Sequence, residues 1–123
     1  MLPTMQPLTT EERLVYEQVN MANREKPISR IALVNKVNRQ SLVPMRERKV
    51  RDLIKDVRRK GGLILSMPGI NGGYYMARSQ EEYDAFQREE FEAKILDMLE
   101  TKRAMDQAAV KQFGQITQLN LEF

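Results

Sequence analysis

The stretch RERKVRDLIKDVRRKGG, residues 46–62, restricts the possible folds of this chain more than any other feature. Its apolar residues recur at helical spacing, and a step of about 100° per residue places them on one face, with charged side chains on the other. The two glycines at its end are typical of helix termination. The pattern therefore predicts a helix with one face in a core and a strongly basic face outside it. The apolar residues are Val50, Leu53, Ile54 and Val57.

Basic charge is concentrated around this helix. Residues 24–60 hold 13 Lys or Arg and four Asp or Glu, a net +9, whereas the rest of the chain holds seven basic and 13 acidic residues, a net −6. Such asymmetry indicates a segment that binds a polyanion, joined to an acidic segment. The alternative is a basic helix face that is simply solvated.

Length and composition exclude several classes of protein. The 123 residues suffice for one domain with an appendage, and no apolar run is long enough to predict a membrane span. The first ten residues lack a signal-peptide pattern, and the absence of Cys suits a reducing cytoplasm. The absence of His removes the commonest general base and metal ligand. We therefore expect a cytoplasmic protein that is not an enzyme, with no metal and no cofactor.

Short helices are predicted on the N-terminal side of the basic helix. Residues 1–8 are expected to be a loose arm, after which Thr9 and Glu12 form a capping box that opens a helix extending to Pro27. Ser29 is expected to cap a second helix, RIALVNKVN, and Asn38 to turn the chain. The basic helix is then expected to begin between residues 41 and 44.

A β-hairpin and a long helix are predicted after the basic helix. The runs LILS and YYMA flank the loop MPGINGG, which is the pattern of two strands and a glycine-rich turn. Ser79 and Glu82 form a second capping box, which opens a helix from about Gln80 to Phe113 that Gly114 can end. Residues 114–123 form a tail that either docks as an extended segment or frays.

The segments RIALVNKVN and RERKVRDLIKDVRRKGGLILSMPGINGGYYMARSQEE together resemble winged-helix DNA-binding proteins, especially small ones encoded by phages and prophages of Gram-positive bacteria. The similarity covers residues 9–83. It implies a mainly α fold with a small β-hairpin wing (α+β): a winged helix-turn-helix domain over 9–78, followed by a long C-terminal helix over 79–113. It also implies that the basic helix enters the major groove of double-stranded DNA.

The resemblance implies a set of residues that contact DNA. Arg48 and Lys49 would read bases, since Arg can bond O6 and N7 of guanine together, and Asp52 would steer these two side chains. Met45 would touch a thymine methyl group. Backbone amides or the Asn71 side chain would act from the wing, although its glycines could serve the turn alone. The predicted DNA-binding residues are Arg30, Arg39, Met45, Arg46, Arg48, Lys49, Arg51, Lys55, Asn71 and Gly72. Arg58, Arg59 and Lys60 are expected to complement the helix dipole, with phosphate contact as the alternative.

The long helix carries a coiled-coil pattern with alternating spacings of four and three residues. It predicts a homodimer, with dimerisation residues Phe91, Ile95, Met98 and Met105 on a seam that also contains Lys102, Ala109 and Gln112. The alternative is a helix packed against its own domain, anchored by Tyr83 and Phe86.

The sequence thus predicts a sequence-specific double-stranded DNA-binding protein, most simply a phage or prophage regulator of transcription or replication in the host cytoplasm. The alternative is an interaction module that captures a host replication or transcription protein. Neither reading involves a membrane.

Overall fold

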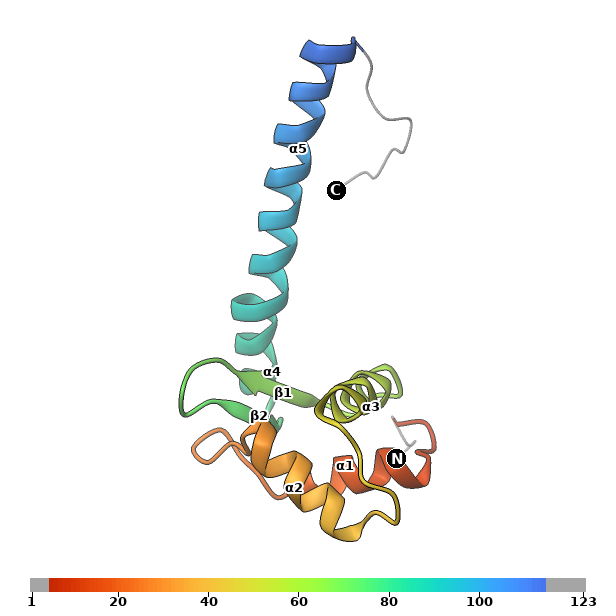
Figure 1. Cartoon of the computed structure of the whole chain (residues 1–123). Coiled ribbons are helices and arrows are strands. Elements are labelled where there is room, and N and C mark those ends of the chain that lie inside the picture. The colour runs from red at the N-terminus through yellow and green to blue at the C-terminus, as the bar shows by residue number, and fades with distance from the viewer. Residues whose placement is uncertain (1–4, 115–123) are drawn as a thin grey trace. The chain divides into compact units, whose positions relative to one another are not determined.

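The computed structural model describes residues 5–114. These residues form two compact units, and the boundary in the sequence lies between Asp84 and Ala85. Helices dominate, and one antiparallel hairpin supplies the β-structure, so the expected α+β class is confirmed. Figure 1 shows the elements in chain order. They are α1 (Thr10–Asn20), α2 (Arg30–Gln40), α3 (Glu47–Arg59), β1 (Ile64–Met67), β2 (Gly73–Met76), α4 (Gln80–Phe86), the π-helical segment η1 (Gln87–Glu92) and α5 (Ala93–Phe113).

Helix α1 begins at the predicted capping box. The Thr9 hydroxyl accepts the Glu12 N–H at 3.2 Å, and the Glu12 carboxylate accepts the Thr9 N–H at 2.8 Å. The predicted extension to Pro27 is wrong, because α1 ends at Asn20. The Arg78 guanidinium donates to the main-chain carbonyl of Asn20, which has no intrahelical partner at the end of α1, and to that of Ala22 just beyond the helix.

Helix α2 begins where it was expected, since Ser29 Oγ accepts the Ala32 N–H at 3.1 Å. It does not end at Asn38, which keeps a helical backbone while α2 continues to Gln40. A loop over residues 41–46 follows, so α3 begins at Glu47, later than predicted. Its end agrees with the sequence: Gly61 adopts a φ of 104°, and the Gly62 N–H donates to the Val57 carbonyl.

The hairpin pairs β1 with β2 in the register Ile64 with Met76 to Met67 with Gly73. A third short segment, missed in the sequence, joins its edge: Ile28 and Tyr74 exchange both main-chain hydrogen bonds at 2.8 Å. A Cβ at Gly73 would lie 2.1 Å from the Ile28 carbonyl oxygen, so this close approach requires glycine. In the first unit, helices α1, α2 and α3 pack against one another, and the hairpin lies beside them, with β2 against α1 and β1 against α3 (Figure 1).

The long helical run from Gln80 to Phe113 is confirmed, with η1 as an insertion that the sequence did not reveal. Ser79 caps it by accepting the Glu82 N–H, but the Glu82 carboxylate accepts the Arg78 N–H, so the second capping box is only half formed. Gly114 ends the run with a φ of 70°. The expectations for the tail fall outside the described residues. None of the helices within residues 5–114 is sufficiently long and apolar to cross a membrane.

Candidate nucleic-acid interface

The two faces of α3 differ as the sequence predicted. The four apolar residues are 0 to 4% exposed and pack toward α1 and α2. The opposite side carries exposed charged side chains: Arg48, Lys49, Arg51, Asp52 and Lys55. Arg39, near the end of α2, and Arg46, which precedes α3, are exposed as well. The first unit therefore presents a basic surface centred on α3.

The start of α3 is fixed by a contact that the sequence analysis missed. The side-chain amide of Asn38 donates to the Met45 carbonyl at 3.0 Å and accepts the Met45 N–H at 2.7 Å. Met45 is 6% exposed, so the expected contact with a thymine methyl group is wrong. Its side chain belongs to the core, and its backbone anchors the chain just before the first turn of α3. No local pattern separates Met45 from the neighbouring Leu42 and Val43, which are exposed, so the sequence offered no signal for this contact.

Two cations of the basic surface lie near carboxylates. Lys49 Nζ is 3.7 Å from Glu11 Oε1, and Arg30 Nη1 is 3.3 Å from Glu47 Oε1. All four side chains are at least half exposed, so each pair contributes only about 0 to 1 kcal/mol. A phosphate can replace either carboxylate at little cost. The expected steering of Lys49 by Asp52 is wrong, because the carboxylate nearest to the Lys49 ammonium is that of Glu11 in α1.

The cations at the end of α3 have different roles. Arg58 donates through Nε to the Ile64 carbonyl at 2.7 Å, and burial lowers the pKa of its guanidinium. Lys60 Nζ lies 2.6 Å from Glu12 Oε1, and this hydrogen bond, followed by the Thr9 N–H, holds the pKa of Glu12 below its ordinary value. Both side chains therefore serve the fold. Of the three predicted helix-end cations, Arg59 is the exposed one.

The loop between β1 and β2, which the sequence analysis expected to be a wing, is a tight turn. The Gly72 N–H donates to the Gly69 carbonyl at 3.1 Å, so the expected use of the Gly72 amide toward DNA is wrong in this conformation. Gly69 has a φ of 103°, and a Cβ at Gly72 would lie 2.1 Å from the Met67 carbonyl oxygen, so the turn itself requires both glycines. Ile70 and Asn71 occupy the two corners and are exposed. Asn71 is thus available as a side-chain donor or acceptor.

The second unit places the predicted dimerisation residues at the surface. Phe91, Ile95, Met98 and Met105 are 39, 50, 71 and 67% exposed, and α5 has no buried residue. Phe91 also packs edge-on against Phe86, with ring centroids 5.0 Å apart. At one of the two polar positions of the seam, Lys102 forms an ion pair with Asp106 at 2.7 Å.

Comparison of the sequence with protein-family models, with curated proteins and with solved structures finds no match.

Proposed function

We propose that the first unit is a winged-helix domain and that the protein binds double-stranded DNA sequence-specifically, with α3 in the major groove. The element order supports this proposal: a helix, the short segment at Ile28, two helices and a hairpin follow one another. A winged helix-turn-helix uses its last helix for recognition and its hairpin as the wing. The observation that carries the proposal is the division of α3 into a buried apolar face and an exposed basic one.

Each cation has a proposed role. Arg48 and Lys49 read base edges, because residues in the first turns of a recognition helix reach deepest into the groove. Arg46, Arg51 and Lys55 contact phosphates, as do Arg30 and Arg39 from the two ends of α2. Asn71 contacts the nucleic acid from the wing, which contains no cation between residues 64 and 76.

The protein is proposed to act as a homodimer through α5. A helix with several exposed apolar side chains along one seam is stabilised by a partner that removes them from water. A second copy offers the same seam, and a dimer would hold two DNA-binding units on two half-sites. The resemblance to small phage and prophage winged-helix proteins supports a role in transcription or replication of such an element.

One observation favours the alternative function, capture of a host replication or transcription protein. Leu42 and Val43, in the loop before α3, are 102 and 72% exposed. Exposed apolar side chains beside a basic helix also suit a protein partner with an apolar and acidic surface.

A salt series distinguishes the two functions. Duplexes selected from a random library would be titrated with the full chain by fluorescence anisotropy at several salt concentrations. The DNA-binding proposal expects tight binding to the enriched site and a log–log slope of about −0.9 for every phosphate contact. Absence of DNA binding at about 150 mM salt would contradict it and support the protein-docking alternative.

Single variants then test the assigned face. Arg48→Ala is expected to relax base preference by about 1 to 3 kcal/mol, whereas Lys55→Ala should weaken all sequences alike and reduce the salt slope by about 1. Lys111→Ala removes an exposed cation from α5 and serves as the control with the same charge change. Lys60→Ala is unsuitable, because it would also remove the partner of the buried Glu12. Equal DNA binding by all three variants would show that α3 is not the DNA-binding face.

A further inference from the structure

Two apolar side chains in the loop before α3 are exposed, although the backbone of this loop is held in place. Leu42 and Val43 are 102 and 72% exposed. Ser41 Oγ donates to the Val43 carbonyl at 2.7 Å. The two hydrogen bonds between the Asn38 amide and the Met45 backbone fix the end of the loop. A partner that covers these side chains would therefore remove apolar surface from water without first having to order the loop.

Val43 lines a hollow of about 430 Å³ at the start of α3. Val43, Pro44 and the buried Met45 supply the apolar part of its lining. Leu42, the preceding residue in the chain, is not part of the lining. The apolar part therefore lies directly beside cations that are assigned to DNA. The charged residues of the lining are Glu11, Arg46, Arg48, Lys49 and Asp52.

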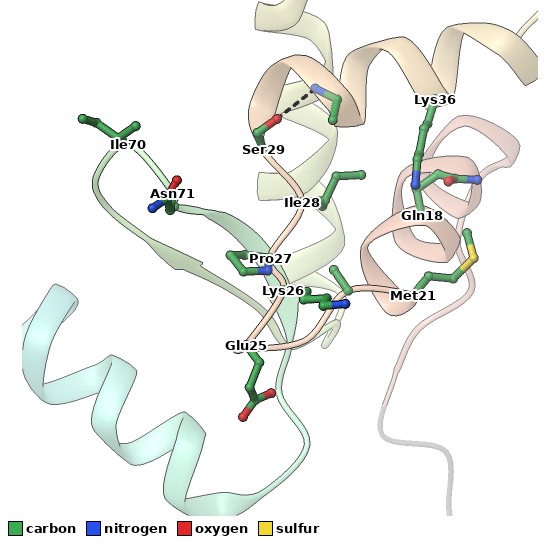
Figure 2. Close-up of a pocket in the computed structure, with 13 residues that line it drawn as sticks. Gln18, Met21, Glu25, Lys26, Pro27, Ile28, Ser29, Lys36, Ile70 and Asn71 are labelled. Carbon is green, nitrogen blue, oxygen red and sulfur yellow. Dashed lines mark hydrogen bonds between the residues drawn. The ribbon is translucent and has the colours of Figure 1, made fainter.

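A different hollow of the first unit, shown in Figure 2, has no such relation to α3. It is lined by the end of α1, residues 25–29, the first half of α2 and the loop between β1 and β2. Its lining includes no residue of α3, which the structure describes in full. The proposed reading of bases by α3 therefore concerns the hollow beside Val43 and not the one in Figure 2.

Of the two partners that this loop suits, DNA matches the surroundings of Val43 better than a protein does. The buried core of a protein–protein interface is depleted of charged residues, whereas charged side chains of both signs adjoin Val43. The major groove of DNA presents hydrogen-bond acceptors and amino groups on the base edges, and its apolar group is the C5 methyl of thymine. An apolar side chain among charged donors and acceptors is therefore complementary to a base edge that contains thymine.

We propose that Val43 reads a thymine in the DNA site by packing against its C5 methyl group, next to the base contacts of Arg48 and Lys49. This inference rests on the proposed DNA binding and adds an apolar contact that selects thymine. Val43 takes the role that the sequence analysis expected of Met45, because Met45 is buried and Val43 is exposed on the same hollow.

Deoxyuridine tests this contact, because it differs from thymidine only by the missing C5 methyl group. In the duplex selected by the full chain, each thymine is replaced in turn, and binding is measured by fluorescence anisotropy. At one thymine or more, the replacement should weaken binding about fourfold, the effect expected for one buried methyl group. The salt slope should not change, because the replacement leaves every phosphate in place.

Two variants assign the contact to its side chain. In Val43→Ala the difference between the thymine and deoxyuridine duplexes should fall below about twofold, because the side chain that covers the methyl group is shortened. Leu42→Ala shortens an exposed apolar side chain of the same loop that lies outside the hollow, so it should keep the full difference.

Two results would overturn the proposal. One is that no thymine shows the difference, as expected if the loop serves only a protein partner. The other is that Val43→Ala keeps the full difference. In either case, tight binding of the unmodified duplex would leave the proposed DNA binding intact, whereas failure to bind any duplex would remove both proposals.

Discussion

Replacing Asn38 with alanine is expected to remove about 1 to 3 kcal/mol of hydrogen-bond stabilisation from the first unit. The Asn38 amide makes two hydrogen bonds to the backbone of Met45, at 3.0 and 2.7 Å, and a net contribution of about 0.5 to 1.5 kcal/mol for each gives this range. Alanine also has a higher helix propensity than asparagine, which offsets up to about 0.7 kcal/mol. Asn35→Ala has the same propensity gain in the same helix at an exposed position, so the difference between the two variants isolates the clamp.

Urea denaturation followed by tyrosine fluorescence measures this difference. The chain has no Trp, and its four Tyr residues all lie in the first unit, so the signal reports that unit alone. Asn38→Ala should unfold at a lower urea concentration than Asn35→Ala, with an unchanged slope. It should also bind the selected duplex more weakly, because the clamp sets the position of the first turn of α3. Identical midpoints for the two variants would refute the argument.

Three further expectations concern stability and assembly. The hydrogen bond from Lys60 lowers the pKa of Glu12. The stabilisation from this pair is therefore present above the ordinary carboxyl pKa of 4.5 and is lost as the pH falls through the folded-state pKa. The difference in unfolding free energy between wild type and Glu12→Gln should be largest near neutral pH and shrink in acid. Gly73→Ala should lower the free energy of unfolding in urea by about 2 to 4 kcal/mol, because the added Cβ would meet a backbone carbonyl. Gly69 has open space around it and only a strained φ, so Gly69→Ala should lower the free energy of unfolding by about 1 to 2 kcal/mol. Ile95→Asp should give a monomer in sedimentation velocity. Leu96→Asp changes a neighbouring apolar position off the seam, which is 61% exposed against 50% for Ile95, and should leave the proposed dimer intact. Dimers from both variants would exclude the proposed seam.

The features that the sequence predicted correctly are set by neighbours along the chain. The caps at Thr9 and Ser29 join residues three apart, and the apolar spacing of residues 50–57 follows from helix geometry alone. The hairpin and the helix end at Gly114 likewise depend on a few consecutive residues. In each case the local sequence contains all of the interacting groups. The α+β class and the amphipathic character of α3 were therefore determined by the sequence itself.

The errors and omissions involve groups far apart in sequence. The last carbonyl of α1, at Asn20, accepts a hydrogen bond from Arg78, and the edge segment at Ile28 depends on its pairing with Tyr74. Lys60 was expected at the helix end and instead pairs with Glu12, 48 positions away. Periodicity cannot identify such partners, because which side chains meet depends on how the helices pack. The sequence thus determined that a basic helix face would exist, whereas only the tertiary structure decided which cations remain on that face and which are used to hold the core together.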